Sequence, residues 1–414
     1  MWIKKIAWLV VVLPLLITSC YKEVVNVEPG EDHFEMLVSS AMQEFIYNSR
    51  DTGYTVEDPE LQLSFNEQVL DLKEIRVRGK SALDYRRKSY VVFLNEPIPV
   101  VDRYGSSVKR LKRFKLLALA MDYTYIENRV AFGILQEAEI MPLFFKFIEF
   151  RMNGETQGVY MLMEDPEQYY KEIDSEFILR RGYDHQIDDS DYTPSLYFIS
   201  EETYLNEFYA IYSMLAQLQG EALLKALDEK LDLDAYFRKI GIDYLLQNGD
   251  YTDEVYLYAT VNGEKVRFHP IPWDYDDIFA TRPHEIGRAW GMGTIFGPRF
   301  YASMEDVYNE IGHTMIYSIE DDLDYTVARD PVLYERYTRV MAEMLEDVDR
   351  DLIERVFLET EKELTPFYQS VSVIEQSVYD RHITNTELWK EYMKEKQEWL
   401  VTRISQIEET VGAN

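Results

Sequence analysis

The spacing of apolar residues divides the chain into a part rich in predicted strands and a part made of predicted helices. Before about residue 300, short runs of β-branched and aromatic residues predict strands, and Asn153-Gly154 and Asn262-Gly263 predict tight hairpin turns. After that point, apolar residues recur every three or four positions, which indicates amphipathic helices. The pattern predicts an α+β core with a helical C-terminal part. The predicted strands are 75–78, 89–94, 114–118, 144–152, 158–164, 177–181 and the hairpin 255–270; the predicted helices are 33–48, 125–139, 205–218, 232–246, 304–318, 332–348, 351–379 and 386–409.

The first twenty residues predict export followed by lipid attachment. Lys4 and Lys5 precede an apolar stretch at 6–17 that is too short for a stable membrane span. A branched apolar residue, two small residues and then Cys20 match a lipobox, and Cys20 is the only cysteine of the chain. Acylation there would anchor the chain stably, whereas an ordinary signal peptide or a tail-less anchor helix is the alternative. We therefore expect a signal peptide at 1–19, a tether and N-terminal helix at 20–60, and a lipid-anchored protein of the bacterial cell envelope, at the outer membrane or cell surface.

The charge of the chain excludes some partners. With 43 Lys and Arg against 75 Asp and Glu, the net charge is −32. Nucleic-acid phosphates and anionic membrane surfaces would be repelled, so nucleic-acid binding is not expected. The charge suits a soluble, exposed protein, or one that attracts divalent cations or a basic protein partner. The six histidines lack the spacing of a zinc hydrolase, and no Gly-x-Ser-x-Gly sequence marks a serine hydrolase.

A cluster of cations surrounds a glycine turn between two predicted strands. Arg78 ends the first strand, Gly79 and Ser81 lie in the turn, and Lys88 precedes the second strand. Such a cluster suits a phosphate ligand, because Lys supplies a point charge and Arg a fork of donors. Taken alone, a solvated basic face explains the same residues, and the glycine spacing of a Walker A loop is absent.

Carboxylates stand at the ends of three other elements. Asp274 and Asp276 follow a predicted strand at alternate positions, where they could share Mg²⁺, Mn²⁺ or Ca²⁺. Asn248 and Asp250 lie between a helix and a strand, where they could position a hydroxyl group or a metal, although a simple turn is the alternative. Glu164 ends the hairpin of Asn153-Gly154, which by itself indicates only a structural element.

Together and in this order, these motifs resemble those of the CotH kinase family, named after spore-coat protein H. The resemblance spans about residues 70–285 and implies an atypical protein-kinase-like fold with a mixed or antiparallel sheet. It places the kinase-like core at 61–295 and a helical part packed on it at 296–414. The motifs are Arg78-Gly79-x-Ser81, Lys88-Ser89-Tyr90, Asn153-Gly154-x5-Tyr160-x3-Glu164, Asn248-x-Asp250 and Trp273-Asp274-Tyr275-Asp276.

The resemblance also implies a reaction: transfer of phosphate from ATP to a protein serine or another hydroxyl group, with Mg²⁺ or Mn²⁺ and with Ca²⁺ as a further candidate. It assigns nucleotide contacts to Lys88, Arg78, Ser81 and Glu164. The catalytic-loop aspartate would be Asp250, beside Asn248, and the metal would be held by Asp274, Asp276 and Asp253.

Two positions depart from the family pattern. Lys80 stands in the glycine turn where the family has asparagine, and Asp253 and Glu254 occupy the stretch where it has an asparagine as second metal ligand. The added negative charge would bind a cation more tightly and disfavour a triphosphate. The alternative function is therefore an inactive kinase-like surface lipoprotein that binds a cation and a protein or glycan partner.

Overall fold

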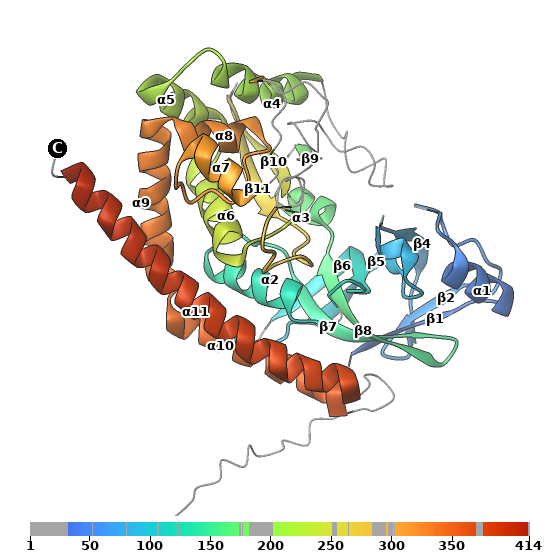
Figure 1. Ribbon diagram of the computed structural model, residues 1–414. Helices are drawn as coiled ribbons and strands as arrows, with labels where there is room; N and C mark the ends of the chain where they lie inside the picture. The colour runs from blue at the N-terminus through green and yellow to red at the C-terminus, as the bar shows by residue number, and fades with distance from the viewer. Residues whose placement is uncertain are drawn as a thin grey trace, which may run out of the picture.

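A mixed eight-stranded sheet forms one half of the protein, and helices around a small second sheet form the other (Figure 1). Cys20 with its lipobox, and Asp253, lie outside the residues that the structure describes. The computed structural model describes residues 32–51, 53–79, 81–105, 107–122, 124–173, 175, 177–181, 202–250, 255–263, 265–283, 295–296, 301, 303–369 and 376–412.

The large sheet has the order β3-β2-β1-β7-β8-β6-β5-β4. Its β1–β7 pair is parallel and its other pairs are antiparallel. Consecutive strands β4, β5 and β6 form a meander at one end of the sheet. The strands are β1 (His33–Leu37), β2 (Gln62–Phe65), β3 (Gln68–Val69), β4 (Leu72–Arg78), β5 (Ser89–Val101), β6 (Val108–Leu117), β7 (Phe145–Met152) and β8 (Glu155–Glu164).

The two faces of this sheet belong to two hydrophobic cores, because successive side chains of a strand point to opposite faces. Phe114 and Leu162 face a core that also contains Ile46 of α1 (Ser40–Asn48). Phe147 and Met161 face the second core, which includes most of the buried residues of α2 (Glu127–Glu137) and continues through the helical half.

The helical half is built around an antiparallel sheet of order β11-β10-β9. Helix α6 leads to the Asn248 loop, and β11 leads directly to Asp274, so this half supplies both predicted carboxylate motifs. The elements are β9 (Phe177–Arg180), β10 (Val255–Asn262), β11 (Lys265–Pro272), α3 (Pro166–Glu172), α4 (Glu202–Leu215), α5 (Gly220–Lys230), α6 (Leu233–Leu246), α7 (Met304–Ile311), α8 (Asp322–Arg329) and α9 (Pro331–Asp347). The 3₁₀ helix η1 (Ser81–Asp84) belongs to the other half, between β4 and β5.

Two long helices, α10 (Arg350–Gln369) and α11 (Gln376–Gly412), run along one side of both halves (Figure 1). Glu363 of α10 accepts hydrogen bonds from Arg129 Nε on α2 (2.7 Å) and from the Phe147 N–H on β7 (2.9 Å). His382 of α11 contacts the carbonyl oxygen of Thr124, just before α2 (3.1 Å). The C-terminal helices therefore fix α2 against the sheet. Within the described residues, no helix combines the length and apolar character needed to cross a membrane.

The predicted α+β class, with a mixed sheet and a helical C-terminal part, is confirmed. Some element boundaries differ. The predicted helix 33–48 begins instead as strand β1, because Phe34 and Met36 are buried at alternate positions. The predicted helix 304–318 ends at Ile311, where Gly312 has φ +65° and interrupts the helix. Helices α3, α5 and α8 were not predicted.

Candidate active site

The segment Trp273–Asp276 is held rigidly from two sides. The backbone N–H of Tyr275 donates to Asn128 Oδ1 on α2 at 2.8 Å. The Tyr275 hydroxyl donates to Asp243 Oδ1 on α6 at 2.8 Å, and Asp243 is itself paired with Lys239 at 2.8 Å in a fully buried ion pair. Tyr275 thus anchors the loop to both α2 and α6. Its two neighbours, Asp274 and Asp276, are therefore carried on a fixed backbone.

The loop that follows α6 is hydrogen-bonded to the residues that follow Asp276. Gln247 ends α6 in the left-handed region (φ +53°), and its carbonyl accepts the Ala280 N–H at 3.1 Å. The Gly249 N–H donates to the carbonyl oxygen of Asp277 at 2.8 Å. A side chain at Gly249 would overlap the Asp277 carboxylate, so glycine is required for this close approach. The contacts bring Asp250 to the loop of Asp274.

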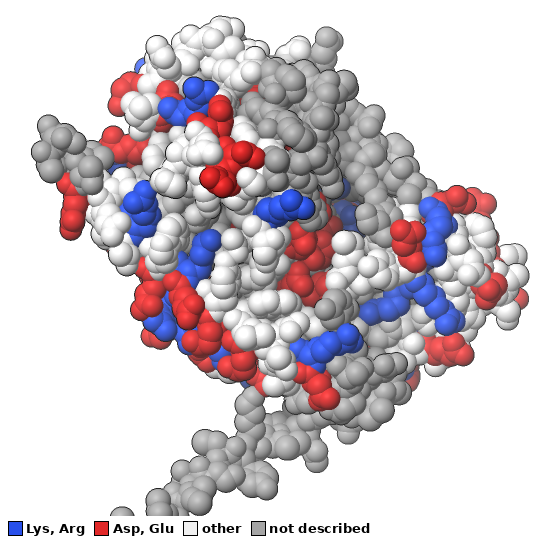
Figure 2. All heavy atoms as spheres, viewed as in Figure 1, with Lys and Arg blue, Asp and Glu red and all other residues white. Residues whose placement is uncertain are grey.

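Six carboxylates interact in this region. Burial raises the pKa of Asp274, and Asp250 raises it further. Burial, and next the charge of Asp274, raises the pKa of Asp276 well above its usual value. On the α2 side, burial followed by the charge of Asp122 raises the pKa of Glu127 to about 10. Figure 2 shows acidic side chains in a hollow between the two halves, where Figure 1 draws the chain after β11. The group comprises Asp122, Glu127, Asp250, Asp274, Asp276 and Asp277.

This crowding predicts that Asp276→Asn stabilises the protein when no metal is present. A carboxyl group whose pKa is raised on folding ionises more readily in the unfolded chain, so the fold is penalised as pH rises above the ordinary Asp pKa. Asparagine removes that penalty. In EDTA at pH 8 the melting temperature of the variant should exceed that of the wild type by roughly 1–3 °C, and the difference should vanish toward pH 4. A lower melting temperature at pH 8 would contradict the electrostatic assignment.

Three cations face the carboxylates. Arg78 at the end of β4, Arg180 on β9 and Lys115 on β6 each lower the pKa of Asp274, against the effect of burial. The Lys115 Nζ lies 4.1 Å from the centroid of the Trp273 ring, and Lys115 is fully buried. The Arg78 guanidinium lies 5.9 Å from the same ring. The structure therefore places Arg78 near Asp274, together with Lys115 and Arg180, which sequence reasoning missed.

Asp165 links these cations to the end of β8. Its carboxylate lies 3.7 Å from Lys115 Nζ and 3.2 Å from Arg113 Nε, and it caps α3 by accepting the Glu167 N–H at 2.8 Å. Asp165 is fully buried, so these cations and the helix N-terminus compensate its charge. It is the direct neighbour of Glu164.

Lys88 and Glu164 have other surroundings. The Lys88 ammonium donates to the backbone carbonyls of Ser49 (3.0 Å), Leu83 (2.6 Å) and Tyr85 (2.8 Å), which uses all three of its protons on the α1–η1 side. Glu164 is paired with Lys109 at 2.7 Å and accepts the Phe144 N–H at 3.1 Å. Neither side chain is joined to Asp274 by these contacts.

The remaining predicted residues lie on the loops themselves. Asn248 is fully buried, and its Oδ1 accepts the Asp250 N–H at 3.3 Å. The backbone of Ser81 opens η1, directly after the glycine turn that follows Arg78. Asn248 therefore shapes the loop that carries Asp250, and Ser81 begins the element that closes the turn.

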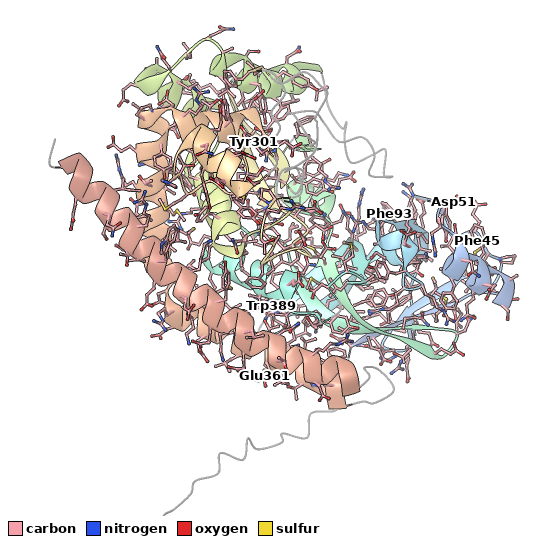
Figure 3. All side chains as sticks on the ribbon, in the orientation of Figure 1. Phe45, Asp51, Phe93, Tyr301, Glu361 and Trp389 are labelled. Carbon is pink, nitrogen blue, oxygen red and sulfur yellow. The ribbon has the colours of Figure 1, made fainter. Side chains whose placement is uncertain are left out.

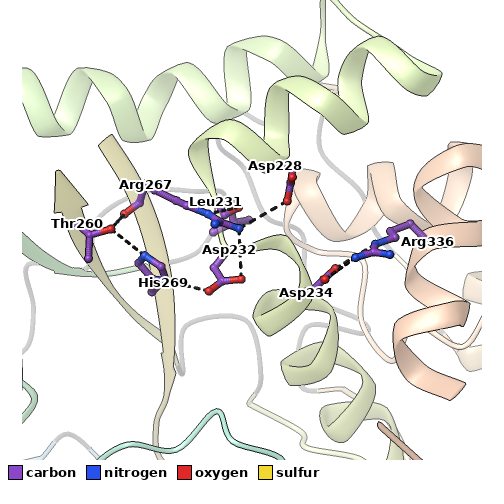
Figure 4. Close-up of polar contacts among 8 residues, drawn as sticks. All are labelled: Asp228, Leu231, Asp232, Asp234, Thr260, Arg267, His269 and Arg336. Atoms are coloured by element: carbon purple, nitrogen blue, oxygen red, sulfur yellow. Dashed lines mark hydrogen bonds and ion pairs between the residues drawn. The ribbon is translucent and has the colours of Figure 1, made fainter. Parts of the chain in front are cut away.

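A polar network braces the two elements that lead to the site (Figure 4). His269 Nδ1 on β11 lies 2.9 Å from Asp232 Oδ2, and Asp232 directly precedes α6. His269 Nε2 lies 2.9 Å from the Thr260 hydroxyl on β10, and Arg267 lies 3.5 Å from Asp232. The hydrogen bond from His269 lowers the pKa of Asp232. The network therefore ties the start of α6 to β11, far from the loops that these elements position.

Helix α11 supports the loops from the outside. The ring of Trp389 stacks on Phe279 with centroids 4.9 Å apart, and Figure 3 labels Trp389 on this helix. The Tyr392 hydroxyl donates to the side-chain oxygen of Gln247. Helix α11 thus contacts both loops: the loop after β11 at Phe279 and the loop after α6 at Gln247.

The donor set fits a magnesium or manganese ion. In the described ranges, no group of three or more His, Cys, Asp or Glu side chains is arranged to hold a metal by itself. Mg²⁺ in phosphate-transferring sites needs only one or two carboxylates, since substrate phosphates and water complete its shell. Asp274 and Asp276 are half-buried oxygen donors whose pKa values are raised by their surroundings, and a divalent cation would relieve the repulsion between their charges.

The chain belongs to the CotH kinase family: residues 75–404, more than half of the chain, match the family of CotH kinase proteins. This match extends through α9 and α10 and most of α11. A similar curated protein is the inner spore coat protein H of Bacillus subtilis (strain 168), which is 22% identical over 240 residues. That alignment covers 54% of this chain and 62% of the relative, so less than two thirds of the relative's length is represented.

Proposed function

We propose that this protein is a metal-dependent kinase that transfers phosphate from ATP to a hydroxyl group of a protein. Membership of the CotH kinase family suggests protein kinase activity, and the site supplies the parts. The observation that carries the proposal is the convergence of Asp250 and Asp274 opposite Lys115 and Arg78 on the sheet. Phosphoryl transfer requires positioning and charge neutralisation more than covalent chemistry, and this convergence can provide both.

The order of elements supports Lys115 as the phosphate-binding lysine. In protein kinases a glycine turn precedes a lysine on the third strand, followed by a helix, a catalytic-loop aspartate and a metal-binding aspartate. Here the turn at Gly79 is followed by Lys115 on the third strand of the β4–β5–β6 meander, then α2, Asp250 and Asp274. Lys88 precedes the second strand of this meander. We therefore assign the lysine role to Lys115 and a structural role to Lys88.

Each side chain has a chemical role in this proposal. Lys115 and Arg78 neutralise the phosphates of the nucleotide, and the Asp165 carboxylate holds Lys115 in place. Asp250 accepts the proton of the attacking hydroxyl group. Asp274 and Asp276 would hold a divalent cation, which would supply charge neutralisation at the phosphates. Tyr275 keeps the two aspartates in register through its bonds to Asn128 and Asp243.

The direct test is phosphate transfer by the purified protein. Incubation with γ-labelled ATP and Mn²⁺ or Mg²⁺ should label the protein itself or a generic serine-containing substrate, and EDTA should abolish the label. Absence of transfer, together with absence of nucleotide binding by calorimetry, would instead favour an inactive scaffold that binds a cation and a protein or glycan.

We further propose that the protein is exported and lipid-anchored through Cys20, on the basis of its lipobox. An alkyne-labelled fatty acid fed to expressing cells should be incorporated into the wild type, and the protein should be recovered with membranes. Cys20→Ser should abolish the incorporation and release the protein. Equal labelling of both forms would rule out this attachment site.

A further inference from the structure

A groove of about 880 Å³ runs along the sheet beside the candidate active site. Its walls are β4, β5 and β6 on one side and α3 on the other. It uses the sheet face that carries the phosphate-binding cations. Arg113 stands two residues before Lys115 on β6, and Arg76 stands two residues before Arg78 on β4, so each pair points to one face. Asp165 contacts both Arg113 and Lys115.

The groove is basic in a protein that is otherwise acidic. Six of its lining residues are Lys or Arg and three are Glu, whereas the whole chain carries a net charge of −32. Its inner cations are already paired, for example Arg113 with Asp165 and Arg76 with Glu74. Of its exposed cations, Lys171 is paired with Glu167. The other three, Lys73, Arg110 and Lys112, form no ion pair with a described carboxylate.

The aromatic ring in the groove wall is covered by cations. Phe93 supplies this ring, and Leu94 and Pro97 add apolar surface beside it. That ring is already covered by the guanidinium groups of Arg113, 4.6 Å from its centroid, and Arg76, at 5.2 Å. The groove therefore offers its ligand charged groups together with apolar surface, in a volume of about 880 Å³ that a single inorganic anion would not fill.

We infer that this groove binds an acidic segment of the polypeptide acceptor, rich in Asp and Glu, beside the phosphorylated residue. That the bound segment belongs to a phosphate acceptor rests on the proposed kinase function. That the groove binds an acidic segment rests on the charge of the groove itself. An acidic segment would be repelled by most of this protein's surface, so Lys73, Arg110 and Lys112 would fix where it docks. Binding there would hold the acceptor hydroxyl near Asp250.

The test is a charge reversal, with a control variant in a separate groove. Lys73→Glu, Arg110→Glu and Lys112→Glu are combined in one variant, and Lys225→Glu and Arg339→Glu, in the separate groove between α5 and α9, form the control. Fluorescence anisotropy follows a labelled peptide of Glu residues around one alanine, with the corresponding Gln peptide as reference. The wild type and the control should bind the Glu peptide, more weakly as salt increases. The groove variant should bind it at least about tenfold more weakly.

Several outcomes would overturn the inference. One is equal binding of the Glu peptide by the groove variant and the wild type. Another is preferential loss of ATP affinity, measured by calorimetry, which would assign the groove to the nucleotide. Circular dichroism melting checks that the variant is folded. Since peptide binding needs no catalysis, binding without phosphate transfer would refute the kinase proposal alone. Transfer to acidic and neutral peptides with the same KM in both proteins would refute the groove alone.

Discussion

Lys115→Met is expected to reduce phosphate transfer by about 1000-fold while the protein remains folded. The Lys115 ammonium is fully buried between Trp273 and Asp165 and acts on Asp274, so its charge is fixed where the nucleotide phosphates would lie. Removal of one preorganised charge of this kind costs about 100- to 1000-fold in rate in other enzymes. The loss should be measured as kcat/KM for ATP, because phosphate contacts act in both binding and the transition state.

Lys88→Met is the matched control. Lys88 is the other candidate for the phosphate-binding role, lies 27 residues before Lys115 and is also buried. Its three carbonyl partners would lose their donor, so this variant should melt at a lower temperature. The folded fraction should keep most of its activity per molecule. If Lys88→Met abolished transfer in folded protein and Lys115→Met did not, the two lysines would have to exchange roles.

Asp274→Asn is expected to abolish metal-dependent activity, with a loss of at least about 1000-fold. The asparagine keeps the size of the side chain but removes the charge that would hold the cation against the nucleotide phosphates. The loop should remain in place because Tyr275 still bonds Asn128 and Asp243. The rate should be measured at several Mn²⁺ concentrations, since weaker metal binding alone would be rescued by excess metal.

Asp347→Asn supplies the matched control for that experiment. Asp347 is an exposed aspartate that faces Arg238 at 3.5 Å, away from the loop of Asp274. Its replacement should leave the rate and its metal dependence unchanged. A residual activity in Asp274→Asn close to that of the wild type would show that another residue holds the cation.

The periodicity of the sequence predicted most of the fold, because buried residues alternate along most strands and recur every three or four positions along most helices. The Asn153-Gly154 hairpin is an example: β7 and β8 flank it as expected, since that dipeptide accepts the positive φ angles of the turn. Short elements escaped prediction. Strand β1 has only five residues beside a helix. Helix α8 carries three aspartate and arginine residues in eight, so its buried face is hidden in the sequence.

The candidate site was predicted where the residues are local in sequence and missed where the fold brings distant residues together. Asp274 and Asp276 stand out because carboxylates this close in sequence are costly unless a cation or hydrogen bonds compensate them. Asp250 stands out only together with the other motifs of the family. Lys115 carried a weaker signal, a lone charge within the apolar run 114–118 that alternates onto the opposite face from Phe114. Arg180 on β9 carried none, because only the pairing of β9 with β10 places it near Asp274.

The central claim is that Lys115 and Asp274 face one nucleotide and one cation. Calorimetric titration of the purified protein with ATP, with and without Mg²⁺, tests it most directly when wild type, Lys115→Met and Asp274→Asn are compared. Binding should be strengthened by Mg²⁺ in the wild type, weakened at least about tenfold in Lys115→Met, and made independent of Mg²⁺ in Asp274→Asn. Equal, Mg²⁺-dependent binding by all three proteins would contradict the claim.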